Sequence, residues 1–228
     1  MKKVVVISLG GSLIVPDDID YKFLEKFKKT IRKHYKNHKF VLVCGGGAIA
    51  RKYISALSKE HKTHKEMSLA GIRATRMNAR FMMQFFGKEA NDTLPKSMVD
   101  VKNNLRKNKV VICGALRYAD KETSDGTAAK LANYLDTIFI NLTNVPGLYS
   151  KNPKKYKSAK FIPKISWKDF ESLALKMKFK AGQHFVLDQS AATLIRKRKI
   201  PTYILGQNLN NLENLLKNKK FTGTEIKG

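Results

Sequence analysis

The chain has 228 residues, of which 45 are lysine or arginine and 18 are aspartate or glutamate, so its formal net charge is +27. Hydrophobic residues make up 43% of the chain, which is enough for a packed core and excludes a wholly disordered protein. No apolar run approaches the roughly 18–20 residues that a bilayer-spanning helix needs, and Met1 to Lys3 lead directly into a strand-like segment without a cleavage site.

Cys44 and Cys113 are the only cysteines, and this number excludes a disulfide framework. Two cysteines cannot complete a structural zinc site, and the five histidines show no ligand spacing with them, so we predict no metal site. We therefore expect a soluble, non-secreted protein of the cytoplasm.

The first part of the chain twice repeats a strand, a glycine turn and a helix. A β-branched run ends at Gly10-Gly11-Ser12, and a second apolar run ends at Gly45-Gly46-Gly47. Helical spacing of apolar residues follows each turn. The predicted strands are Lys3 to Leu9 and Phe40 to Cys44, and the predicted helices start at Asp20 or cover Ala48 to Leu57 and Met67 to Phe86.

The rest of the chain continues the alternation of strands and helices. We predict strands at Lys109 to Cys113, Thr137 to Leu142 and Pro201 to Leu205, and helices at Ser97 to Lys107, Asp125 to Leu135, Ser166 to Lys178 and Val186 to Arg198. Thr143 to Lys160 is interpreted as a flexible crossover. This order predicts an α/β protein, an αβα sandwich with a mainly parallel central sheet. We expect one domain over residues 1–228, with halves of about 1–120 and 121–228 that meet near Gly114 to Ser124.

Glycines and small polar residues follow several predicted strands. In open parallel sheets, ligands bind beyond the carboxyl ends of the strands, where this chain has its two glycine turns, Gly114 and Thr143-Asn144. Glycine lets backbone N–H groups approach an anion, and the next helix adds its positive N-terminal dipole, so the pattern suits phosphate. Tight strand-to-helix turns are the alternative explanation for each single glycine pair. Neither a Walker A loop nor a GxGxxG turn after a strand is present.

Six ordered motifs resemble the uridylate (UMP) kinases of the amino acid kinase superfamily, and the archaeal branch is the most similar. The motifs are ISLGGS at 7–12, VCGGGAIARKYI at 43–54, GIRATRMNA at 71–79, TSDGTAAKLANYL at 123–135, LTNVPGLYSKNPKK at 142–155 and KAGQHFVLDQSAATLI at 180–195. The resemblance implies an αβα sandwich that transfers a phosphoryl group from ATP, with Mg²⁺, to a nucleoside monophosphate. The first half would bind the acceptor, most simply UMP, and the second half the donor.

The resemblance also assigns roles to individual residues. Gly10 and Gly11 would line the path of the phosphoryl group, and Gly46, Gly47 and Arg51 would hold the acceptor phosphate, with Thr123 in the acceptor site. Asp125 and Asp188 would be carboxylates near the reacting group. Thr143, Asn144, Gly147, Tyr149 and Asn152 would form the donor loop.

Each assignment has a structural alternative in the sequence. Arg51 is also explained as a solvated helix residue, and Ser124 or Asp125 as a helix N-cap. Asp188 suits the first turn of a helix, where the dipole favours an acid. Asn144 to Gly147 is equally explained as a turn, with Tyr149 packed on the sheet edge.

Several positions depart from the pattern that the resemblance implies. Ser8 stands where many members have a lysine, and Lys180 is our candidate for the missing cation. Ser68 stands where an aspartate holds the acceptor ribose, Ala115 replaces a threonine, and Pro146 and Asn152 replace donor-loop aspartates. These changes affect the identity of the acceptor more than the general kinase assignment.

Two other functions remain compatible with the sequence. One is a kinase for another small phosphate or carboxylate in the same superfamily. The other is a catalytically lapsed, basic RNA-binding relative, suggested by the net charge of +27. Because aromatic residues do not alternate with the basic ones, we expect only weak, salt-sensitive adhesion to nucleic acid. The resemblance also suggests a homo-oligomer, a hexamer built from dimers.

Overall fold

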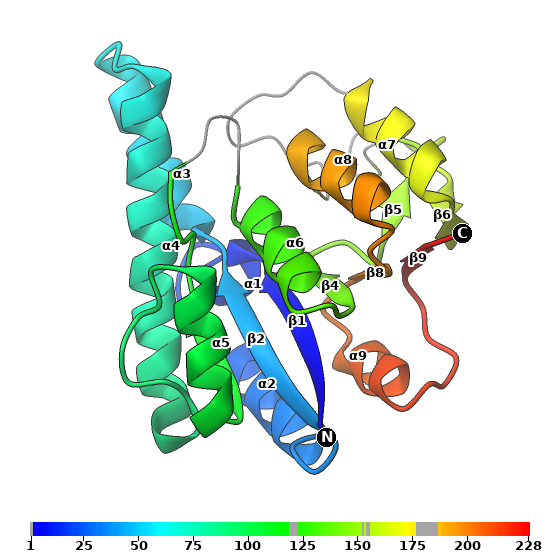
Figure 1. Cartoon of the computed structure of the whole chain (residues 1–228). Coiled ribbons are helices and arrows are strands. Elements are labelled where there is room, and N and C mark those ends of the chain that lie inside the picture. Colours follow the sequence, from blue (N-terminus) through cyan, green and yellow to red (C-terminus); the bar gives the residue numbers. More distant parts are fainter. Residues whose placement is uncertain (1, 119–122, 152, 154–155, 177–186) are drawn as a thin grey trace.

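The computed structural model describes residues 2–118, 123–151, 153, 156–176 and 187–228. Figure 1 shows a central sheet with helices on both faces. None of the helices in these ranges is long and apolar enough to span a membrane.

Within these ranges the central sheet has seven strands in the order β3-β2-β1-β4-β8-β9-β7. The first five run parallel to one another, and β9 pairs antiparallel with β8, so the predicted mainly parallel sheet is confirmed. A second sheet consists of the antiparallel pair β5 and β6. The strands are β1 Lys3–Leu9, β2 His38–Cys44, β3 Val110–Cys113, β4 Phe139–Leu142, β5 Leu148–Tyr149, β6 Phe161–Ile162, β7 Lys164–Ile165, β8 Thr202–Leu205 and β9 Thr224–Ile226.

Helices form the two outer layers. The core on one face of the sheet includes residues of α2 Tyr21–Lys33, α4 His64–Phe86 and α9 Leu209–Leu216. The core on the other face includes residues of α5 Met98–Lys107, α6 Ser124–Tyr134, α7 Trp167–Leu175 and α8 Gln189–Arg198. The other helical elements among the described residues are α1 Gly11–Ile14, α3 Gly47–Lys59, which packs along α4, and the 3-10 turn Gly87–Glu89. The αβα sandwich is therefore confirmed.

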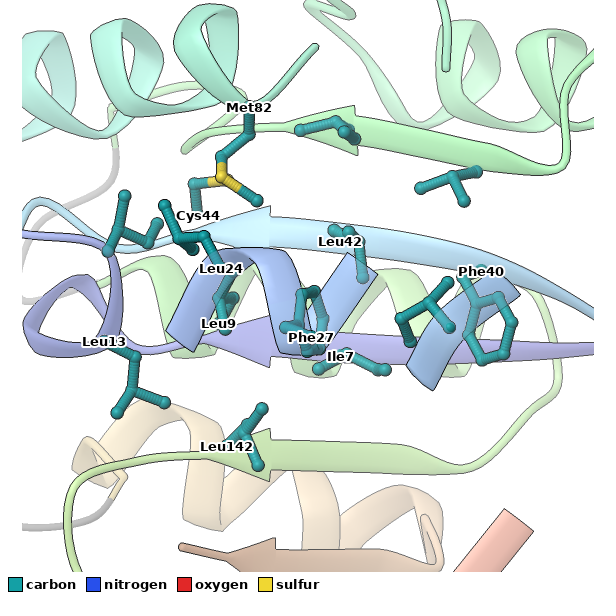
Figure 2. Close-up of a cluster of buried hydrophobic side chains, with 14 of the residues drawn as sticks. Ile7, Leu9, Leu13, Leu24, Phe27, Phe40, Leu42, Cys44, Met82 and Leu142 are labelled. Carbon is teal, nitrogen blue, oxygen red and sulfur yellow. The ribbon is translucent and has the colours of Figure 1, made fainter. Parts of the chain in front are cut away.

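The central strands are buried on both faces, as their continuous apolar sequences predict. Alternate residues of β1 enter different cores: Ile7 and Leu9 face α2, and Val6 faces the opposite helix layer. Figure 2 shows Leu24 and Phe27 of α2 packed over these strands. Cys44 and Cys113 are free and belong to opposite cores, in agreement with the expected absence of a disulfide.

Some local predictions need correction. Thr123 caps α6, since its hydroxyl accepts from the Asp125 amide at 3.1 Å, so neither Ser124 nor Asp125 is the N-cap. The helix predicted from Val186 begins at Gln189, because the Asp188 side chain caps it. The Thr143 to Lys160 connection is more than a flexible crossover, because it contains β5, which pairs with β6 just beyond it. The sequence patterns also missed α1, α9 and the short strands β6, β7 and β9.

Candidate active site

The first two glycine turns pack directly against each other at the carboxyl ends of β1 and β2. A Cβ atom on Gly11 would lie 2.0 Å from the Gly47 amide nitrogen, and one on Gly45 would lie 2.4 Å from the Gly11 nitrogen. Gly47 has a φ of +62°, which side-chain-bearing residues rarely adopt. These glycines are therefore required by the close approach of two backbone turns, and this approach forms the floor of the candidate site.

The third expected strand end joins the same edge. The Gly10 amide donates to the Leu142 carbonyl at 2.9 Å, so the first turn continues the pairing between β1 and β4. The next residue along, Thr143, donates its amide to Leu205 at the end of β8. The turns after β1, β2 and β4 thus lie side by side, as the parallel topology predicts.

Arg51 lies at the mouth of the second turn, one helical turn into α3. Its Nη2 donates to the Pro16 carbonyl at 2.9 Å, and the residue is half-buried. This hydrogen bond holds the guanidinium beside the glycine turns instead of leaving it fully solvated. This bond uses one of the five N–H donors of the guanidinium, a group whose donor pattern matches phosphate oxygens.

Ser68 lies on α4, the helix that contacts the second turn through Gly71 and Ala74. Three residues after it, Gly71 has its carbonyl oxygen 3.6 Å from the Cβ position of Gly46. Three residues span about 4.5 Å along a helix, so Ser68 is about one turn from this contact. The Ser68 hydroxyl lies 3.5 Å from Nδ1 of His64.

Asp125 projects from the first turn of α6 toward β1. Its Oδ1 accepts a hydrogen bond of 2.6 Å from the hydroxyl of Ser8, a fully buried residue of β1. Because Thr123 caps the helix, the Asp125 carboxylate is available for this contact at the end of the strand.

Burial is the main cause that raises the pKa of Asp125 to about 7, and the negative charge of Asp188 adds to the rise. The Ser8 hydrogen bond acts in the opposite direction because it stabilises the ionised form. The Asp125 carboxyl group therefore ionises in the neutral pH range. Such a perturbed acid, at the end of β1 beside the first glycine turn, is typical of a functional site.

Asp188 is held by donors from two helices. Its Oδ1 accepts from the Ala191 amide at 2.7 Å and the Ser190 hydroxyl at 2.6 Å, which caps α8. Its Oδ2 accepts from the Thr123 hydroxyl at 2.5 Å and the Thr123 amide at 3.3 Å. Thr123 thereby ties the N-terminus of α8 to that of α6, and both helix dipoles point their positive ends toward the two carboxylates.

The expected donor loop forms the other side of this edge. Gly147 is buried, and a Cβ atom there would lie 2.7 Å from the Thr224 hydroxyl. Tyr149 packs edge-on against Phe161 at 5.4 Å between ring centroids, which agrees with its alternative as a packing residue. Thr143 and Asn144 are half-buried, and the Thr143 Cα lies 3.6 Å from the Cβ position of Gly10 in the first turn. Lys180 and Asn152 lie outside the described residues.

Sequence patterns missed the side chains that donate hydrogen bonds to the backbone carbonyls of the turns. Asn78 of α4 is buried and donates to the Gly45 carbonyl at 2.7 Å. Arg76 donates to the carbonyls of Ala115 and Leu116 at 3.0 and 2.7 Å, and thereby holds the segment after β3. The sequence did contain one indication for Asn78, because it is a polar residue at a helix position where the periodicity predicts a core-facing apolar one.

A separate groove of about 670 Å³ lies between α2 and α9. Its lining includes Lys22, Lys26, Lys29 and Lys33 but none of the predicted site residues. Lys29 pairs with Glu25 at 2.9 Å and Lys33 with Glu213 at 3.3 Å. These pairs agree with a solvated basic surface rather than part of the candidate site.

The family model of the amino acid kinase family matches residues 3–206. A uridylate kinase of Thermoplasma volcanium is 33% identical over 227 residues, which cover 99% of this chain and 98% of that protein. A uridylate kinase of Thermococcus onnurineus is 33% identical over 89% of this chain and 90% of its own length.

Solved structures give the same result. The crystal structure of uridylate kinase from Archaeoglobus fulgidus superposes with a TM-score of 0.85 at 30% identity, over 99% of this chain and all of that one (100%). The UMP kinase of Ureaplasma parvum, at 21% identity and a TM-score of 0.80, shares the fold. With matches of this extent to its sequence and its fold, the chain belongs to the amino acid kinase family.

Proposed function

We propose that this protein transfers the γ-phosphoryl group of ATP to UMP and releases ADP and UDP. The single observation that carries the proposal is the gathering of the β1, β2 and β4 turns with Asp125 at one edge of the sheet. Full-length similarity to uridylate kinases supports the choice of reaction and acceptor.

Phosphoryl transfer depends mainly on in-line positioning and on neutralising the charge of the phosphoryl oxygens. In our proposal Gly46, Gly47 and Arg51 hold the UMP phosphate, and Ser68 and Thr123 border the acceptor. Gly10 and Gly11 line the path between the two substrates, where their lack of side chains lets the phosphates approach the backbone. Thr143, Asn144, Gly147, Tyr149 and Asn152 hold the donor. Most of the acceptor side thus falls in residues 1–120, and the donor side falls in 121–228.

Asp125 and Asp188 act through groups around the phosphoryl oxygens. Above its pKa of about 7, Asp125 offers a carboxylate that would accept hydrogen bonds from cationic groups bound near the phosphoryl oxygens. Asp188 keeps the α6 and α8 N-termini together through Thr123, so their positive dipole ends face the transferred group. Ser8 stands where many family members have a lysine, and in our proposal Lys180 supplies that positive charge instead.

Magnesium fits this site as an ion bound to the nucleotide. Within the described ranges, no group of three or more His, Cys, Asp and Glu side chains could hold a metal by itself. The phosphates of ATP would hold the ion, which neutralises charge on the phosphoryl oxygens.

An assay of ADP release with UMP, CMP, dUMP, isopentenyl phosphate and acetylglutamate tests the proposal. UMP should give the highest kcat/KM, and turnover should require both ATP and Mg²⁺. Highest activity with isopentenyl phosphate or acetylglutamate would assign a different acceptor. No activity with any of them, together with RNA binding that persists at moderate salt, would favour the RNA-binding alternative.

Assembly is a further part of the proposal. By family resemblance we expect a homo-oligomer, a hexamer built from dimers. Sedimentation of the purified protein would detect this state, and a single monomeric species at micromolar concentration would contradict it.

A further inference from the structure

Ser8 is a polar residue inside a strand that is otherwise apolar from Val4 to Leu9. It is fully buried, and it precedes Gly10 by two residues. Burying a hydroxyl is unfavourable unless it finds a hydrogen-bond partner. Its partner is Asp125, which is 117 residues away in the sequence, with the Ser8 oxygen 2.6 Å from Oδ1.

Helix capping does not explain the contact. The Thr123 hydroxyl caps α6, and the Asp125 amide is the donor in that cap. The Asp125 side chain is therefore not used for the helix start. Instead it reaches β1, a strand held on both sides by β2 and β4. A rigid strand and a short hydrogen bond together restrict the carboxylate to one orientation.

We propose that Ser8 is a positioning residue for phosphoryl transfer, whose hydroxyl fixes the Asp125 carboxylate at the carboxyl end of β1. The inference rests on the proposed function only for its kinetic consequence, since the contact itself exists in the free protein. Ser8 does not touch substrate in this assignment, because it is buried behind the first glycine turn.

The contact has two separable effects. First, the hydroxyl favours the ionised form of Asp125, against burial and the negative charge of Asp188, which both favour the protonated form. Secondly, it holds Oδ1 in place once the group is ionised. The first effect changes the pH at which Asp125 loses its proton. The second effect persists at high pH, where Asp125 is ionised whether or not Ser8 is present.

The test compares Ser8→Ala with the native protein, and Thr202→Val serves as the matched control. Thr202 is an equally buried hydroxyl of the same sheet, and it donates to the Ile200 carbonyl at 3.0 Å instead of to a carboxylate. NMR of aspartate labelled with ¹³C at the carboxyl carbon follows Asp125 without substrates, and Asp125→Asn identifies its signal. Steady-state kinetics with ATP and UMP from pH 5.5 to 9 follows the consequence.

We expect the Asp125 titration midpoint to move to higher pH by about one pH unit in Ser8→Ala, from the usual strength of a hydrogen bond to a charged group. The acid limb of kcat/KM should move with it, which is about a tenfold loss on that limb. At pH 9 kcat should still be reduced while the KM values for ATP and UMP stay within about twofold of the native values. Thr202→Val should change stability alone.

An unchanged Asp125 midpoint in Ser8→Ala would overturn the inference, and so would an equal shift in Thr202→Val. If the alanine variant does not fold, Ser8→Cys keeps the side-chain volume with a weak donor and should shift the midpoint in the same direction. If UMP is not the acceptor, the kinetic arm fails with native protein as well, but the NMR arm still decides the role of Ser8. The two failures are therefore distinguishable.

Discussion

Asp125→Asn should abolish turnover and at the same time stabilise the folded protein at neutral and alkaline pH. The pKa of Asp125 rises from 3.8 to about 7 on folding, so between these values the folded state binds a proton that the unfolded state has lost. Stability therefore falls as pH rises through this window, and one pKa unit corresponds to about 1.36 kcal/mol, which gives a loss of ~4 kcal/mol above pH 7.

Asparagine removes the charge but not the burial of a polar group, so we expect a gain of about half that value, ~2 kcal/mol at pH 8. Its Oδ1 can still accept from Ser8. The gain should shrink as pH falls toward 4, where the native carboxyl is protonated in the folded state and increasingly so in the unfolded one. Urea unfolding at pH 8, 6 and 4.5 measures this difference, and ADP release measures turnover.

Asp100→Asn is the matched control with the opposite sign. Asp100 accepts from the backbone amides of Lys96 and Ser97, which lower its pKa, so this variant should lose stability at pH 8. An Asp125→Asn protein that is less stable than the native one at pH 8, or whose stability difference does not change with pH, would refute the reasoning. Full activity of this variant would remove Asp125 from the mechanism.

Arg51→Ala should raise the KM for UMP at least tenfold and leave the KM for ATP nearly unchanged, since one phosphate contact is lost. Truncation of the exposed Arg73 to alanine is the control, and it should change neither KM in the same assay. Ser68→Asp should tighten UMP binding about tenfold in calorimetry by adding an ionised acceptor for ribose, with Ser68→Asn as the neutral control, and weaker binding would show that this position does not face the ribose. The buried His34 and His38 have Nε2 and Nδ1 atoms without a hydrogen-bond partner, and burial lowers both pKa values. The unfolded chain therefore binds protons that the folded protein does not, so these residues should reduce stability as pH falls below about 6.5, and His38→Phe should weaken that fall in urea unfolding.

Strand and helix periodicity predicted most of the sandwich because the central strands are buried on both faces. Segments such as Lys3 to Leu9 carry apolar residues at nearly every position, and this pattern has few structural solutions besides a covered parallel strand. The short strands β7 and β9 left no such signal, since strands of two or three residues depend on their neighbours for pairing. The α9 helix was missed because its eight residues include three asparagines, which favour turns as isolated residues.

The glycine turns after β1 and β2 were predicted as parts of a site, and parallel topology gives the reason that they meet. The tertiary structure supplied a different reason for the glycines themselves: Gly11 and Gly47 lie too close for a side chain on either. The contact between Gly11 and Gly47 could not be predicted from their separation in the sequence.

From the sequence alone came the α/β class and the edge of the sheet at which a phosphate would bind, because periodicity and strand ends are local properties. The two carboxylates of the candidate site came from the resemblance of sequence motifs to a known family. Only the tertiary structure decided which groups control those carboxylates. Ser8 and Asp125 are 117 residues apart, and Thr123 and Asp188 are 65 apart, yet each pair shares a hydrogen bond. Burial and proximity of charge set the protonation of Asp125, and both arise only when the strand and the two helices are packed together.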